Sequence, residues 1–345
     1  MRYYWSTERS GESKEDSKTM KSCVRFILVF VIATSLTLTA LAINPPLSTQ
    51  SCNRPASSTA RVAAPASQAL FDDFNYSNHK DLAKHGWIVR TADGWPGIPG
   101  AKWRTEGVSF IKDSDQLGNR ILRMTSTTDG TSANTTQTQI CQQRKFMEGT
   151  YAARVRFVDA PVSGPSGDQL VESFYTISPL KAPMDPDYSE LDFEYLPNGG
   201  WGSVGPTLYV TSWRTFSPEP NWQKDNVFYN TGGSKAGWHT LVTQVSAGKV
   251  KYFIDGVALA EHSGQYYPRS IMSINFNLWF IKDQTVKSPD RRAYQEDIDW
   301  VFHEANSALT PQEVETKVAA MRRKSIRFRD TVPAPSPALI SPCNF

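Results

Sequence analysis

Short runs of alternating hydrophobic and polar residues occupy the middle of the chain, from about residue 69 to residue 304. They are rich in β-branched and aromatic residues, and Gly, Pro, Asn and Asp separate them; the clearest are 119–127, 149–158, 172–178, 189–196, 206–213, 237–245, 249–256, 270–280 and 296–304. Alternation over such lengths is typical of half-buried strands. Because many short strands follow one another and no long helices separate them, the pattern predicts an all-β sandwich of antiparallel sheets.

Two turns support antiparallel pairing. The sequence SAGK, residues 246–249, joins two of the predicted strands, and Asp255-Gly256 follows directly after the second of them. Asp-Gly is a preferred dipeptide in two-residue hairpin turns. Residues 237 to 256 and beyond are therefore expected to form consecutive hairpins.

One helix is predicted on the C-terminal side, within residues 309–326. Thr310 is a favourable N-cap, Pro311 suits the first helical position, and Glu313 completes a capping box. The basic run Arg322-Arg323-Lys324 falls near the C-terminal end of the helix, where cations oppose the macrodipole. The remaining residues, 330–345, have the composition of an unstructured tail.

The N-terminal residues have the pattern of an export signal. An apolar run, residues 26–42, follows Lys18, Lys21 and Arg25 and ends in Ala-Leu-Ala. A cleaved signal peptide, with Met20 as an alternative start, and an uncleaved membrane anchor both fit residues 1–42. Both alternatives place the rest of the chain outside the cell. A Pro/Ser/Ala-rich linker at 43–68 leads to the folded domain at 69–304. The helix and the tail follow at 305–345.

Composition and charge restrict the partners. The chain has 345 residues, 39% of them hydrophobic, which is enough for one large core, and a formal net charge of +3. Such a charge provides no dense basic surface, so we expect no nucleic-acid partner. We also expect the protein to be a monomer. A membrane is a partner only if the N-terminal segment stays as an anchor.

The cysteines are few. Cys23 would leave with a signal peptide, so Cys52, Cys141 and Cys343 would remain, an odd number that allows at most one internal bridge. Cys52 and Cys343 flank the folded region and could join the two tails in an oxidising compartment. Cys141 would then be a buried, inert thiol.

Candidate chemistry lies in SELDFEYL, residues 189–196. Glu190, Asp192 and Glu194 occupy every second position, so on a strand all three share one face, while the apolar residues between them face the core. Glu190 and Glu194 are about 13 Å apart between Cα atoms, at roughly 3.3 Å per residue. Their side chains can lean together to the carboxyl separation of about 5 to 5.5 Å that retaining glycosidases use.

The repulsion within this triplet has a chemical use. Three neighbouring acids cannot all ionise cheaply, so the pKa of at least one rises and a proton remains available. A retaining enzyme needs one ionised carboxylate and one protonated carboxylic acid. Two other readings are an acidic, solvent-facing strand and a calcium site, although like charges destabilise a sheet and a straight strand wraps poorly around one ion.

The chain resembles glycoside hydrolase family 16, and within it the licheninase-like branch. ELDFE matches the regular ExDxE motif, and FDDFN, YAARVRF, ESFYTIS, GWHTLVTQV, KVKYFIDG, IMSINFNLW and DIDWV follow the family's order over residues 69–304. The resemblance implies a β-jelly roll of the concanavalin A-like kind with an open cleft. It also implies that Glu190 is the nucleophile, Glu194 the general acid/base and Asp192 their helper.

Further site residues are expected from this resemblance and from the chemistry of sugars, whose apolar faces stack on aromatic rings. Asn277 and Trp279 match cleft positions, and Arg154 matches a sugar-binding arginine. His239 either resembles a position near the acids or is a structural histidine. Four tryptophans in loops or at strand ends, Trp95, Trp103, Trp201 and Trp213, can be either subsite platforms or core residues. Asp299 resembles a ligand of a structural calcium ion, and no other cofactor is expected.

Some positions depart from the licheninase pattern. Ala152 stands where those enzymes have a sugar-binding glutamate, and Tyr188-Ser189 replaces the Trp-Asp before their nucleophile. The sequence therefore predicts a secreted, retaining endo-β-glycosidase acting on a β-glucan-type polysaccharide, with the linkage left open. A transglycosylase and a non-catalytic carbohydrate-binding sandwich are the alternatives.

Overall fold

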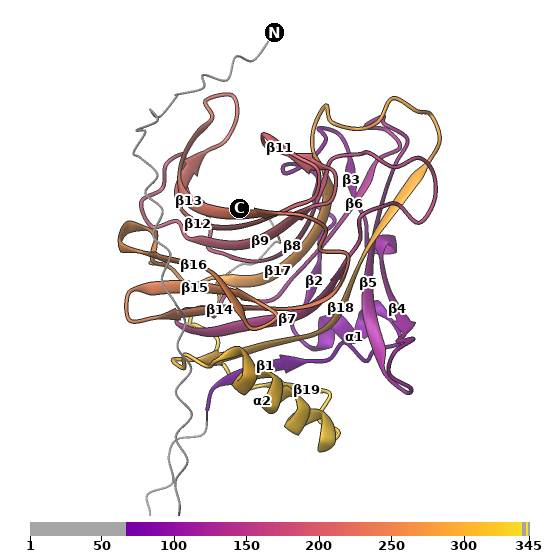
Figure 1. Ribbon diagram of the computed structural model, residues 1–345. Coiled ribbons are helices and arrows are strands. Elements are labelled where there is room, and N and C mark those ends of the chain that lie inside the picture. Colours follow the sequence, from indigo (N-terminus) through magenta and orange to yellow (C-terminus); the bar gives the residue numbers. More distant parts are fainter. Residues whose placement is uncertain (1–66, 340–342, 344–345) are drawn as a thin grey trace, which may run out of the picture. The chain divides into compact units, whose positions relative to one another are not determined.

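Two antiparallel sheets pack face to face in residues 67–339 and Cys343, the part of the chain that the computed structural model describes (Figure 1). The first, called the cleft sheet here, has the strand order β13 (Gln223–Gly232), β12 (Thr207–Ser217), β9 (Glu190–Leu196), β8 (Leu170–Ile177), β17 (Ser273–Phe280), β6 (Thr136–Cys141) and β2 (Ile88–Val89). Its strands curve around an open concave face. This is the all-β jelly-roll sandwich that the sequence predicts.

The second sheet, called the back sheet, has the order β16 (Val257–Ser263), β15 (Lys249–Ile254), β14 (Gly237–Ser246), β7 (Gly149–Phe157) and β18 (Arg292–Ala305). The long β18 then pairs with β5 (Arg120–Thr128) along its first half and with β1 (Ala69–Asp72) near its end. β4 (Val108–Lys112) pairs with β5, and β3 (Lys102–Trp103) pairs with β6 in parallel. A single pair between β5 and β6 joins the two sheets.

The core lies between the sheets and follows the predicted alternation. From β9, Leu191, Phe193 and Tyr195 enter this core, and Val155 and Val250 meet it from the back sheet. Each of these side chains is at most 3% exposed, so burying them removes most of their apolar surface from water. The alternate positions of β9 are thereby left for the concave face.

The predicted hairpins are present. Ala247 and Gly248 turn β14 into β15 with φ of 50° and 74°, and Asp255 and Gly256 turn β15 into β16 with φ of 49° and 81°. Two successive positive φ angles are the signature of a two-residue hairpin turn of the type that Asp-Gly favours.

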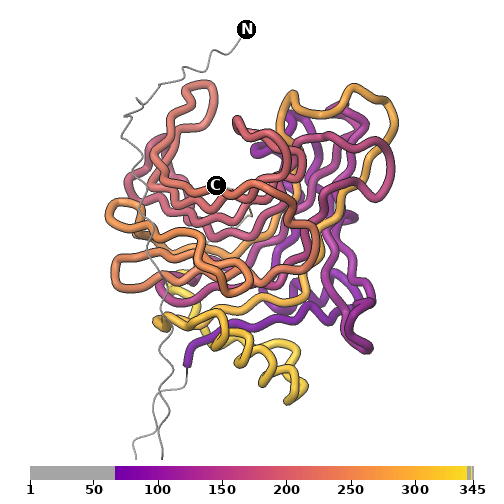
Figure 2. Tube along the Cα trace, in the orientation of Figure 1, coloured from indigo at the N-terminus to yellow at the C-terminus, as the bar shows by residue number. Residues whose placement is uncertain are grey.

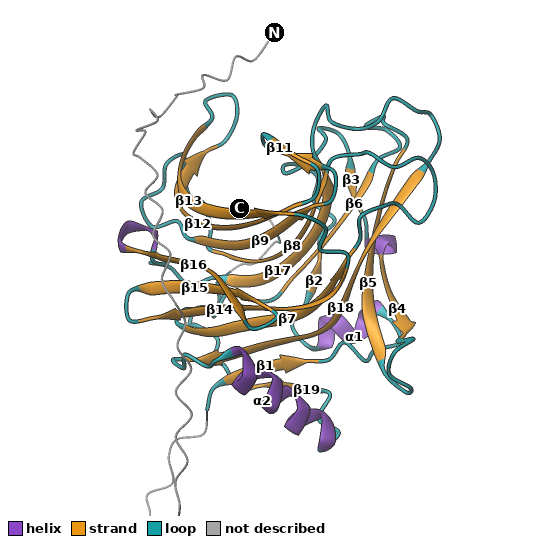
Figure 3. Ribbon diagram, viewed as in Figure 1, coloured by secondary structure: helices purple, strands orange, loops and turns teal. Residues whose placement is uncertain are grey.

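The C-terminal helix, α2 (Pro311–Arg323), begins as predicted, with the Thr310 side chain accepting from the Glu313 amide in a complete capping box. Its Val314 and Val318 pack on the outer face of the back sheet against Ala152 and Trp300. Figure 3 shows this helix beneath the back sheet. The other α-helix of the described residues, α1 (His79–Lys84), was not predicted.

The predicted end of the folded domain near residue 304 is too early. After α2, β19 (Phe328–Asp330) pairs with β1, and the Thr331 amide donates to the carbonyl of Ala69. Figure 2 shows the beginning of the described chain, in indigo, beside the yellow segment that follows α2. The start of the expected unstructured tail is therefore bound to the sheet.

The cysteine pairing also differs from the prediction. Cys141 at the end of β6 forms a disulfide with Cys343, with 5.4 Å between their Cα atoms. Cys141 is therefore not a free thiol, and Cys343 is not available to Cys52. The signal peptide or anchor and nearly all of the linker lie outside the described residues, and within those residues no helix is long and apolar enough to cross a bilayer.

Candidate active site

The three acids of β9 line one cleft on the concave face. β9 pairs with β8 on one side and β12 on the other, and neither ladder has a register shift between Glu190 and Tyr195. Because the strand is regular, Glu190, Asp192 and Glu194 point to the same side. Glu190 and Glu194 remain partly exposed, whereas Asp192 between them is buried.

Burial and mutual repulsion shift the titration of these acids. Burial raises the pKa of Glu190 to about 7, and a hydrogen bond from the Tyr188 hydroxyl partly opposes this rise. Burial and the charge of Glu190 raise the pKa of Glu194 to about 8. The pKa of Asp192 is raised well above its usual value, first by burial and then by the charges of the two glutamates. The hydrogen bond from Tyr188 therefore favours the ionised form of Glu190, and the charge of Glu190 favours the protonated form of Glu194.

Two hydrogen bonds hold the acids in place. The Tyr188 hydroxyl donates to Oε2 of Glu190 at 2.5 Å, and the indole nitrogen of Trp213 donates to Oδ2 of Asp192 at 2.9 Å. Trp213 is the β12 partner of Glu190 in the register of the sheet. Trp213 was expected to be either a subsite platform or a core residue. In the structure it contacts the triplet itself.

The cleft floor continues across β8 and β17 with polar side chains that bond one another. Ser173 donates to Oδ1 of Asn277 at 2.5 Å, and Asn277 also hydrogen-bonds Tyr175. Gln139 on β6 donates to the Tyr175 hydroxyl at 2.8 Å. Asn277 lies beside the acids as predicted, but its contacts make it a positioning residue for the floor.

Aromatic rings stand on two sides of the triplet. Beyond Glu194, Trp201 lies 5.6 Å from Tyr209 and 6.2 Å from Trp279 between ring centroids, and it is 43% exposed. Trp201 sits in the tight turn between β10 (Gly199–Gly200) and β11 (Ser203–Val204). Trp279 lines the cleft, so this group offers an accessible surface for an apolar sugar face.

On the Glu190 side, the ring of Phe216 contacts three tryptophan rings. Its centroid lies 5.6 to 5.8 Å from those of Trp95, Trp213 and Trp222. Trp95 lines the cleft and is 47% exposed. Trp103 differs from the other tryptophans, since it is fully buried and its ring lies 4.1 Å from the Arg90 guanidinium. Trp103 is therefore a core residue and not a subsite platform.

Two predicted site residues lie elsewhere. Arg154 is on β7 and His239 on β14, both in the back sheet, where Arg154 contacts Asp299 and the ring of Trp238. The two ring nitrogens of His239 are bonded to the Asp255 carboxylate and the Lys235 carbonyl. The expectation that they touch substrate beside the acids is wrong, because the sequence did not show which strands share a sheet.

The residues around Asp299 do not fit a calcium site. Its carboxylate accepts from Arg322 at 2.6 Å and from Asn119 at 2.8 Å, and the Arg154 guanidinium lies 3.7 Å away. Two cationic groups beside one carboxylate disfavour a further cation. In the described residues, no three His, Cys, Asp or Glu side chains are grouped to hold a metal ion.

Sequence reasoning missed several residues of the site. Tyr188 could have been found, since it precedes Glu190 by two positions and the same alternation places it on the same face. Tyr175, Ser173 and Gln139 reach the cleft only through the pairing of β8, β17 and β6. No local pattern signals such a register between distant segments.

The described chain is thus a jelly-roll sandwich with a row of acids in an aromatic-flanked cleft. Its fold is similar to two solved Bacteroides ovatus proteins, a mixed linkage glucan family 16 protein in complex with its product and a glycoside hydrolase family 16 endo-glucanase. Their TM-scores are both 0.50, with 17% and 18% identity, and each match covers 67% of this chain and 98% of the other. A Bacillus licheniformis β-glucanase matches with a TM-score of 0.49 and 18% identity, over 69% of this chain and 98% of its own.

No protein-family model matches the sequence. The curated proteins contain no relative of significant similarity. At these identities the structural likeness establishes the fold.

Proposed function

We propose that this protein is a secreted, retaining endo-β-glycosidase of glycoside hydrolase family 16 that hydrolyses a β-glucan-type polysaccharide. The observation that carries the proposal is the pair Glu190 and Glu194, which share one face of a regular strand in one cleft and differ in pKa. The regular strand is also the feature of the ExDxE motif that supports the licheninase-like branch.

In the first step of the proposed reaction, the carboxylic acid of Glu194 gives its proton to the glycosidic oxygen. The carboxylate of Glu190 attacks the anomeric carbon, the bond to the leaving sugar breaks, and a glycosyl ester on Glu190 forms. Glu190 suits this role because the Tyr188 hydroxyl donates a hydrogen bond to it and so stabilises its ionised form.

In the second step, the Glu194 carboxylate takes a proton from water, and the resulting nucleophile attacks the same carbon. The ester bond breaks, Glu190 returns as a carboxylate, and Glu194 is again protonated. Asp192 holds the spacing between the glutamates, and Trp213 fixes its carboxylate. Both steps need only the side chains of the triplet and water.

The surroundings of the triplet support a polymer as substrate. Exposed aromatic rings at Trp201 and Trp95 flank the acids on two sides, and such rings stack on the apolar faces of sugars. An endo-acting enzyme needs an extended binding surface, and the lining of the cleft crosses β9, β8, β17 and β6. The internal disulfide supports the proposed export, since such bonds persist in oxidising compartments.

A panel of polysaccharides tests the proposal. The parent chain and Glu190→Gln are incubated with β-1,3-glucan, β-1,4-glucan, mixed-linkage β-glucan and galactans, and new reducing ends and product sizes are measured. Hydrolysis of a β-glucan by the parent and its loss in Glu190→Gln are expected. Equal activity of both chains would remove the assignment, and binding without turnover on every polymer would favour the carbohydrate-binding alternative.

Two further experiments distinguish hydrolysis from transglycosylation and test the acid role of Glu194. Products longer than the substrate, formed when oligosaccharide acceptors are added, would identify a transglycosylase. For Glu194→Gln, a glycoside with an acidic aryl leaving group should still form the glycosyl ester, because that leaving group does not need a proton. An equal loss of ester formation from aryl glycoside and polymer would contradict the acid role of Glu194.

A further inference from the structure

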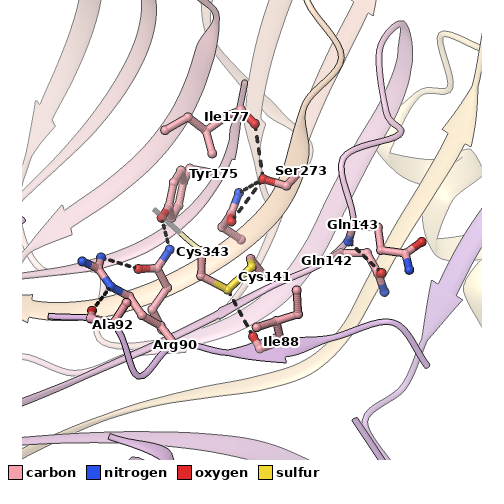
Figure 4. Close-up of a disulfide and its surroundings, with 12 residues drawn as sticks. Ile88, Arg90, Ala92, Cys141, Gln142, Gln143, Tyr175, Ile177, Ser273 and Cys343 are labelled. Atoms are coloured by element: carbon pink, nitrogen blue, oxygen red, sulfur yellow. Dashed lines mark hydrogen bonds between the residues drawn. A yellow bond between two sulfur atoms is a disulfide. The ribbon is translucent and has the colours of Figure 1, made fainter. Parts of the chain in front are cut away.

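The disulfide binds Cys343 to the floor of the cleft. Its partner Cys141 on β6 lies opposite Asn275 on β17. Asn275 in turn lies opposite Tyr175 on β8, and Tyr175 lies opposite Asp192 on β9. Neighbouring strands lie about 4.8 Å apart, so Cys141 is roughly 14 Å from Asp192 along this row. Figure 4 shows Cys343 bonded to Cys141 with Tyr175 and Ser273 nearby.

Cys343 lines the same cleft as the catalytic acids. It is 3% exposed, and its sulfur lies 3.3 Å from the carbonyl oxygen of Ile88 on β2. Cys343 is therefore seated in the concave face and does not hang from its edge.

The floor of the cleft is buried along its whole length. Asp192 on β9 and Ser173 on β8 are each 2% exposed, and Gln139, Ser273 and Asn275 on β6 and β17 are 2%, 1% and 1% exposed. Glu190 and Glu194 beside this floor remain partly exposed. On the β6 side, Cys343 joins the lining through its disulfide.

The direction of the cleft gives the position of Cys343 a consequence. The cleft runs across the strands, since its lining passes from β9 over β8 and β17 to β6. A sugar chain placed over β9 would extend over β12 and β13 in one direction and over β8 and β17 in the other. In the second direction it would meet Cys343 before it reached β2.

We infer that Cys343, held by its disulfide to Cys141, narrows the substrate cleft on the β6 side and limits the number of sugar units that bind there. This inference rests on the proposed glycosidase function and adds a determinant of product length to it. Cys343 acts on specificity through the space that it occupies, and it takes no part in the bond cleavage.

The test measures kcat/KM on β-glucan oligosaccharides of increasing length. The compared chains are the parent, Cys343→Ser and a chain ending at Leu339, with Cys52→Ser as the matched control outside the disulfide. In the parent and the control, kcat/KM should stop rising at a shorter substrate than in the two variants without the disulfide. In those variants it should rise several-fold further with at least one added sugar unit, while the shortest substrates react as in the parent.

The same limiting length in all four chains would overturn the inference. Should Cys343→Ser and the shortened chain fail to fold, the comparison is made on the folded Cys52→Ser chain before and after reduction of its disulfide. If no chain hydrolyses any oligosaccharide, the proposed function fails; binding of the same series to Glu190→Gln, with and without reductant, then decides the inference. An unchanged limiting length for binding would refute it.

Discussion

The hydroxyl of Tyr188 donates a hydrogen bond to Oε2 of Glu190 at 2.5 Å. Tyr188 is fully buried by its neighbours, so this donor is fixed in place beside the carboxylate. A donor of this kind stabilises the ionised form of the acid and lowers its pKa, against the larger opposite effect of burial. The balance of the two sets the pH at which the proposed nucleophile becomes charged.

Replacement of Tyr188 by Phe should move the acidic limb of the pH–activity profile to higher pH. The ring and its packing are kept, while the hydrogen bond is lost, at a cost of about 1.5 kcal/mol or roughly one pH unit. Measurement of kcat/KM against pH checks the shift. Tyr229→Phe on the exposed strand β13 is the control, and an acidic limb at the same pH in both variants would contradict the role of Tyr188.

The parent enzyme should show a bell-shaped profile displaced to neutral pH. Activity requires Glu190 ionised and Glu194 protonated, so kcat/KM should rise through about pH 7 and fall above about pH 8. A profile from about pH 4 to pH 10 tests this. A maximum near about pH 4.5, where exposed carboxyls titrate, would show that burial does not control the pair.

Trp201→Ala should weaken substrate binding. Its exposed ring stands next to Trp279 and Tyr209, and loss of one stacking surface is expected to raise KM about 2- to 12-fold, equivalent to roughly 0.5 to 1.5 kcal/mol. Arg154→Ala is the matched comparison, because Arg154 lies on the back sheet and should leave KM unchanged. A larger rise in KM for Arg154→Ala than for Trp201→Ala would contradict the assignment of substrate binding to the concave face of the cleft sheet.

A buried acid pair should make stability depend on pH. Glu172 and Glu296 are fully buried, and three of their four carboxyl oxygens have no hydrogen-bond partner. Burial raises the pKa of both well above the usual value, and in Glu172 the charge of Glu296 adds to the rise. Both are therefore neutral in the folded chain at a pH where they ionise in the unfolded chain.

As the pH rises above about 4.5, the unfolded chain releases these protons and the folded chain keeps them, so the stability they contribute is lost. Glu296→Gln should remove part of this loss. The difference in free energy of unfolding between Glu296→Gln and the parent should grow by up to about 1.4 kcal/mol per pH unit. Urea unfolding between about pH 5 and pH 7 measures it, with Glu219→Gln on an exposed loop as control. Parallel stability curves for Glu296→Gln and the parent would refute the prediction.

The fold was largely predictable from local alternation. Each predicted strand exists, and Thr310 and Glu313 cap α2 as expected. Two of the missed strands, TQTQIC in β6 and QKDNVFYNTG in β13, have sequences with little apolar alternation. β6 is held by neighbours on both sides and β13 pairs with β12, so pairing, and not hydrophobic patterning, defines them.

The candidate site was predictable only where it lies on one strand. Alternation alone placed Glu190, Asp192 and Glu194 together, and the structure has them lining one cleft. The positions of Arg154 and His239, and the disulfide of Cys141 with Cys343, depend on contacts between segments far apart in sequence. Residue type and spacing do not carry that information, so these expectations failed.

The central claim is that Glu190 and Glu194 cleave by two successive displacements at one anomeric carbon. Proton NMR of the first product released from a β-glucan, recorded before the anomers equilibrate, tests it most directly. Two inversions should leave the new reducing end in the β configuration. A first product in the α configuration would mean a single displacement by water and would contradict the proposed role of Glu190.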